Sequence, residues 1–154
     1  MSTSEVLRHL LPIGVVTMLT GLSAVNASDP DPRVMSFKLP DQLQWSENHG
    51  NGQNALLYGD PRKPGFYMVL HKWPPHTMGR PHSHPNDRFI YVVEGTWWVG
   101  SGSKYDPDST FPMPKGSFVR HLSKQVHYDG AKEGEVILLI SGEGPDTAPS
   151  GDAK

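Results

Sequence analysis

The chain has 154 residues, which is room for one domain, and its 16 glycines and 15 prolines disfavour long helices and favour short strands joined by turns. Its formal net charge of −2 excludes nucleic-acid binding driven by a basic surface. The absence of cysteine excludes disulfide scaffolds, cysteine nucleophiles, thiolate zinc sites and iron–sulfur clusters.

Residues 1–27 have the pattern of a secretory signal peptide. Arg8 precedes an apolar stretch at 10–25, and Val25-Asn26-Ala27 offers short side chains at a cleavage site. The stretch is shorter than the roughly 20 residues that a membrane-spanning helix needs. We expect cleavage after Ala27, no membrane contact afterwards, and an exported chain that is periplasmic or secreted. An uncleaved N-terminal anchor or a docked helix is the alternative.

The rest of the chain reads as strands and turns. Residues 28–42 form a turn-rich leader, 43–143 a β-barrel domain, and 144–154 a flexible tail rich in glycine, proline and aspartate. Apolar, aromatic and β-branched runs predict strands at 65–71, 88–94, 96–99, 117–121 and 135–141. Turn residues lie at 95, 101–103, 106–108 and 129–130. Many short strands at this spacing indicate an all-β sandwich or barrel.

Two histidines one residue apart are the sharpest chemical feature. His82 and His84 precede a strongly apolar strand, and on an extended chain their side chains point to the same face. Two neutral imidazoles that face inward are a ready pair of metal ligands. A third histidine, His127, follows a later strand and turn. Serine-hydrolase, phosphate-loop and dinucleotide-binding motifs are absent from the sequence.

The stretch from about residue 73 to 143 resembles the cupins, a family of small double-sheet β-barrels. In the first cupin motif His82 and His84 match the histidine pair, Gly95 matches the closing glycine, Arg88 stands in place of the glutamate, and His76 stands in place of the opening glycine. The resemblance implies a jelly-roll barrel, or double-stranded β-helix, that is often dimeric, so we expect a homodimer.

The second cupin motif is kept in part. Gly116 opens it and His127 matches its histidine, whereas Leu122 and Lys124 replace its proline and inner glycine. The resemblance therefore implies one divalent transition metal held by His82, His84 and His127. Imidazole ligands suit iron, manganese, nickel, copper and zinc, so the metal's identity stays open.

The loss of the motif's glutamate has a chemical consequence. Three neutral imidazoles leave the charge of a divalent ion uncompensated, which favours an anionic substrate or hydroxide as a further ligand. An inward Arg88 needs a carboxylate, which Glu94, Asp87 or a substrate can supply; an outward Arg88 is the third alternative. Asp87 would be a substitute metal ligand if a bulge turned it inward.

Other residues are weaker candidates for the site. His121 could be an acid or base in the pocket or orient a neighbouring group, with a structural histidine as the alternative. His76, Trp97 and Tyr128 could line the substrate pocket, with plain packing as the alternative for the tryptophan. His71 is assigned an ordinary core or surface role.

The resemblance implies a metal-dependent cupin oxidoreductase similar to the small cupin dioxygenases, and its catalytic residues would be Arg88 and His121. Its substrate would be a small acidic, phenolic or enolic molecule. A secreted cupin that binds a small ligand or a metal without catalysis is the alternative from another class. A metal-free isomerase or epimerase that uses histidine and tyrosine as acid and base is the third.

Overall fold

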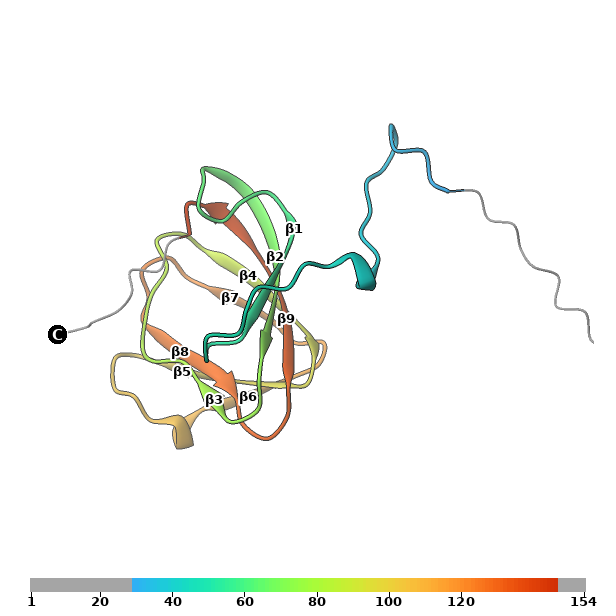
Figure 1. The fold of residues 1–154 in the computed structure, drawn as a ribbon. Helices are drawn as coiled ribbons and strands as arrows, with labels where there is room; N and C mark the ends of the chain where they lie inside the picture. Colours follow the sequence, from blue (N-terminus) through green and yellow to red (C-terminus); the bar gives the residue numbers. More distant parts are fainter. Residues whose placement is uncertain (1–28, 147–154) are drawn as a thin grey trace, which may run out of the picture. The chain divides into compact units, whose positions relative to one another are not determined.

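The computed structural model describes residues 29–146 (Figure 1). The predicted signal peptide and most of the predicted tail lie outside the described residues, so both stay predictions. Residues 1–36 and 37–154 are separate units. In the described part of the first unit, the backbone N–H groups of Val34 and Met35 donate to the carbonyl of Asp31. Within 29–146, neither short helix has the length or apolar character to span a membrane.

Nine strands and two 3-10 helices make up the described part of the second unit. One antiparallel sheet has the order β1-β2-β9-β4-β7 and the other β3-β8-β5-β6. The all-β prediction is confirmed. In chain order the elements are η1 (Pro40–Gln42), β1 (Gln53–Tyr58), β2 (Gly65–Trp73), β3 (Thr77–Met78), β4 (Arg88–Glu94), β5 (Thr96–Ser101), η2 (Pro107–Ser109), β6 (Phe111–Pro114), β7 (Phe118–His121), β8 (His127–Ala131) and β9 (Val136–Gly144).

Every strand expected from the sequence is present, as β2, β4, β5, β7 and β9. The turn expected at residues 129–130 is wrong, because Asp129 and Gly130 lie inside β8. Gly130 serves close packing here. A Cβ atom at this position would lie 2.2 Å from the carbonyl oxygen of Thr77 on the neighbouring strand.

The core forms from alternate residues of the central strands. Along β9, Val136, Leu138 and Ile140 are buried, and the residues between them are half-buried, as strand geometry requires. Trp97 on β5 is the bulkiest fully buried side chain. Burial of each such side chain contributes about 1.5–3 kcal/mol. This apolar layer is also the floor of the cavity described below.

Candidate metal centre

Backbone pairing brings the first and third histidines together. His82 and His127 form an isolated antiparallel bridge in which each N–H donates to the other's carbonyl at 2.9 Å. Residues paired this way point their side chains to the same side. The N–H of Lys124 donates to the carbonyl of His84 at 2.7 Å, which fixes the second histidine to the same loop. Lys124 has φ 62°, a left-handed conformation that glycine adopts at less cost.

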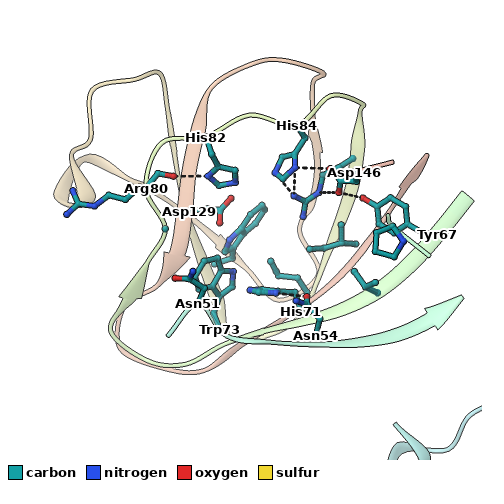
Figure 2. Close-up of a pocket in the computed structure, with 17 residues that line it drawn as sticks. Asn51, Asn54, Tyr67, His71, Trp73, Arg80, His82, His84, Asp129 and Asp146 are labelled. Carbon is teal, nitrogen blue, oxygen red and sulfur yellow. Dashed lines mark hydrogen bonds and ion pairs between the residues drawn. The ribbon is translucent and has the colours of Figure 1, made fainter. Parts of the chain in front are cut away.

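The three imidazoles converge. The ring centroids of His82, His84 and His127 lie 4.6 to 5.4 Å apart, and one nitrogen from each lies within 4.8 Å of the others. Figure 2 shows His82 and His84 projecting into the same cavity. His84 and His127 are buried, and His82 is half-buried.

Hydrogen bonds set which nitrogen of each ring is free. The Nδ1 atoms of His82 and His127 lie 2.7 Å from the carbonyl of Arg80 and 3.1 Å from that of Gln125. In His84, Nδ1 lies 2.9 Å from a carboxylate oxygen of Asp146. Because all three partners only accept, each Nδ1 carries the proton and each Nε2 keeps a lone pair. This is how proteins orient histidines toward a metal.

Burial favours the neutral form of two of these imidazoles. It lowers the pKa of His127 to about 3, and it lowers the pKa of His84 against the opposing effect of Asp146. Among the described residues the buried Nε2 of His127 has no hydrogen-bond partner. A neutral imidazole with an unused lone pair is a transition-metal ligand. The cluster of three histidines therefore offers ligands that suit a transition metal, and it could hold a metal ion.

Arg88 lies against this cluster, with its side chain 15% exposed. Its guanidinium donates a hydrogen bond to Nε2 of His84, and its Nε lies 3.7 Å from a carboxylate oxygen of Asp146. A metal at the three Nε2 atoms would take this lone pair of His84 and leave the guanidinium free to bind an anion.

Arg88 therefore pairs within the protein with Asp146. The sequence analysis had expected Glu94 or Asp87 as its internal partner. Asp87 instead accepts from the backbone N–H of Ser123 at 2.7 Å and from Nε of Arg120 at 2.9 Å. Both of its oxygens are occupied by these donors, so it does not serve as a substitute metal ligand. Glu94 forms no ion pair within the part of the chain that the structure describes.

Asp146 is a site residue that the sequence analysis missed. Its carboxylate accepts from His84 and from the hydroxyl of Tyr67, and its backbone N–H donates to the carbonyl of Pro61. Burial raises the pKa of Asp146, but the hydrogen bonds and Arg88 outweigh that effect and lower it overall. A single aspartate beyond the last predicted strand gives no periodic signal. Only the position of the inward Arg88 could have indicated that a carboxylate was needed.

A cavity of about 520 Å³ opens beside the histidines. Its walls come from both sheets and are mainly apolar: Val69, Trp73, Trp97, Leu138 and Ile140. His71 lies in the wall, and its Nδ1 is 2.8 Å from the amide oxygen of Asn54 (Figure 2). Burial lowers the pKa of His71 to about 4. The sequence analysis assigned His71 an ordinary core or surface role, and the structure places it in the cavity wall.

The other predicted pocket residues are dispersed. Trp97 lines the cavity, but His76 is exposed in the turn between β2 and β3, and buried Tyr128 donates its hydroxyl to the carbonyl of Asp106 instead. His121 is buried with its ring centroid 3.7 Å from that of His127. Both histidines line a second cavity of about 290 Å³.

Buried neutral histidines make the protein sensitive to acid. Burial lowers the pKa of His121 to about 2, as it lowers those of His71 and His127. Below pH 6.5 the unfolded chain binds protons at these residues that the folded chain does not bind, so stability falls as pH falls. At pH 5 each histidine is expected to cost up to about 2 kcal/mol. Urea unfolding of chelator-treated protein at pH 7.5 and pH 5 measures this loss. Equal free energies of unfolding would contradict it.

Comparison with known proteins identifies the fold. No protein-family model matches the chain, and no curated protein matches its sequence. Solved structures do match. KdgF from Halomonas sp. has a TM-score of 0.57 and 18% identity over 73% of this chain and 96% of that one. An RmlC-like cupin from Shewanella frigidimarina NCIMB 400 has a TM-score of 0.57 and 16% identity, over 77% and 94%.

A third match is the polyketide cyclase RemF from Streptomyces resistomycificus, with a TM-score of 0.59 and 18% identity over 75% of this chain and 82% of that one. Identities this low establish the fold and leave the function to the site itself. The sequence resemblance, the two antiparallel sheets and these neighbours agree: the chain has the cupin fold, a double-stranded β-helix with a histidine cluster that could hold a metal.

Proposed function

We propose that the protein is a metal-dependent cupin enzyme, dioxygenase-like, that acts on a small acidic, phenolic or enolic substrate. The observation that supports the proposal is the arrangement of His82, His84 and His127, in which each Nδ1 lies beside a carbonyl or carboxylate oxygen and one nitrogen of each ring lies within 4.8 Å of the others. Histidines that bind a metal almost always donate the other ring N–H to such an oxygen.

A divalent transition metal held by three imidazoles would supply open coordination positions for a substrate oxygen and for O₂, or Lewis acidity if the metal is zinc. A dioxygenase reaction places both oxygen atoms in the substrate and takes its electrons from the substrate, so no external reductant is needed. The ligand set suits iron, manganese, nickel, copper or zinc.

The residues around the cluster have separate tasks in this proposal. The guanidinium of Arg88 binds a carboxylate or enolate oxygen, which it can do in bidentate fashion. Asp146 holds both Arg88 and the imidazole of His84 in place. Trp73, Trp97 and the aliphatic wall exclude water. A cavity of about 520 Å³ is of the size that encloses a small organic molecule.

Metal analysis followed by oxygen uptake tests the proposal. Protein purified from its own host should contain close to one equivalent of a redox-active transition metal. With a β-diketone, a phenol or a hydroxy acid it should consume O₂ in proportion to the substrate added. Protein without metal, or metal-loaded protein that consumes no O₂ with any of these classes, would contradict the proposal. Tight ligand binding without product would identify a binding protein instead.

A further inference from the structure

We propose that the second cavity, of about 290 Å³, is the path by which O₂ reaches the metal site while the substrate fills the main cavity. The inference rests on the proposed function, because only a reaction with O₂ needs such a path. It gives a role to a cavity that the proposed reaction leaves unused, and to His121 as part of its wall.

The three-histidine cluster contributes side chains to both cavities. His82 and His84 line the main cavity, His127 lines the second, and none of the described residues lines both. His121 stands beside His127 in the second cavity, with the two ring centroids 3.7 Å apart. A metal held by the three histidines would therefore have a ligand in the wall of each cavity, and the second cavity ends at one of its ligands.

The second cavity lies at a gap between the two sheets. β7 is the last strand of one sheet and β6 is the last strand of the other, and the described strands show no pairing between these two edges. At the rim of the cavity Phe111 is 66% exposed and Leu122 is 51% exposed, whereas His121 and His127 are each 7% exposed. The cavity therefore leads from the solvent to a histidine of the cluster.

The wall of the second cavity suits a small apolar molecule. The main cavity is lined by the charged side chains of Arg88, Asp129 and Asp146. In the second cavity the guanidinium of Arg120 is held by Asp87. A hydrated or anionic molecule would lose water there without gaining a partner, whereas apolar cavities bind apolar molecules such as xenon. Most of the wall is apolar: Val99, Phe111, Met113, Val119, Leu122 and Val126.

The proposed reaction gives O₂ a reason to use this path. Substrate and O₂ must reach the metal in the same complex, and Arg88, which contacts His84, binds the substrate in the main cavity. A substrate that fills this cavity leaves no room there for a second molecule to pass. The second cavity is slightly smaller than the roughly 300–1,000 Å³ of pockets for drug-sized ligands, so it suits O₂ better than a second organic molecule.

Dissolved O₂ tests the cavity in metal-free protein, because O₂ is paramagnetic and broadens the NMR signals of nearby methyl groups. Under O₂ pressure the methyl signals of Leu122 and Val119 should broaden more than those of Leu56, which is 43% exposed on β1 and lines neither cavity. Val119→Phe fills part of the cavity and should reduce the broadening at Val99. Equal broadening at Leu122 and Leu56 would overturn the proposal.

The dependence of the rate on O₂ is the second measurement, made on metal-loaded protein with a saturating amount of the β-diketone, phenol or hydroxy acid that supports O₂ uptake. Val119→Phe should raise the KM for O₂ severalfold and leave the affinity for the organic substrate unchanged. Leu122→Trp, at the exposed rim, should act in the same direction without disturbing the core. Leu56→Trp is the matched control and should keep the KM of the unchanged protein.

The outcomes separate this proposal from the proposed function. An unchanged KM for O₂ in both Val119→Phe and Leu122→Trp would overturn the path and leave the proposed oxygenase activity intact. No O₂ uptake by the unchanged, metal-loaded protein would overturn the proposed function, and with it this use of the cavity, even if the methyl signals broaden.

Discussion

Replacing His82 with alanine is expected to abolish stoichiometric metal binding and leave the fold intact. Binding energies of about 12 kcal/mol for a four-ligand transition-metal site correspond to about 3 kcal/mol for each ligand, or roughly 100-fold or more in affinity. His82 is the least buried of the three histidines, and its backbone bridge to His127 does not depend on the side chain. Its removal therefore affects the metal site more than the core.

Elemental analysis after gel filtration measures this effect, with circular dichroism to confirm the fold. His49→Ala is the matched control, because the side chain of His49 is 81% exposed and remote in sequence from the cluster. The control should keep about one metal ion per chain. If His82→Ala kept that ion too, His82 would not be a ligand and the convergence of the three rings would need another explanation.

The sequence predicts the histidines well because their arrangement is local. Alternation along an extended strand places His82 and His84 on one face, whatever the rest of the chain does. The third ligand was harder to predict, because His127 lies 45 residues beyond His82 in the sequence. A backbone bridge between the two brings them together. The resemblance to the cupin motifs identified this third ligand, and the bridge shows its physical basis.

The carboxylates of the site were harder to predict, for two different reasons. Asp146 meets Arg88 only after β9 ends and the chain turns back, and no alternation or spacing in the sequence specifies that contact. Asp129 precedes a glycine, and that pair of residues is typical of turns. In the fold the same glycine allows β3 to pack closely on β8. The sequence analysis interpreted this glycine as a turn residue, whereas its role is close packing.

His71 shows a third limit of sequence reasoning. It continues the apolar run of β2, where a lone histidine has no distinguishing neighbour. Its role in the cavity wall depends on Asn54 of β1, which fixes the ring through Nδ1. The sequence predicted β2 but not β1, so neither this contact nor that side of the cavity could be derived from it. A cavity wall formed by paired strands can be predicted only when the pairing of those strands is known.

Arg88→Met is expected to separate metal binding from recognition of an acidic ligand. The guanidinium is the one cationic group of the described chain that contacts the three-histidine cluster, so its loss should weaken binding of a carboxylate by about 100-fold. Metal affinity should be kept or rise, because a positive charge beside the ion is removed. Arg88→Lys keeps the charge but loses the bidentate geometry. Its affinity for a carboxylate should therefore lie between those of Arg88→Met and the unchanged protein.

Salicylate and phenol, titrated into the metal-loaded protein, isolate the contribution of the carboxylate. Salicylate should lose affinity in Arg88→Met, whereas the affinity for phenol should change little. Because the substitution leaves Asp146 as a buried carboxylate without its cation, it should also destabilise the fold by about 3 kcal/mol. Adding Asp146→Asn should recover much of that stability without restoring salicylate binding. A parallel loss of both ligands would show that Arg88 maintains the shape of the cavity and does not bind the anion.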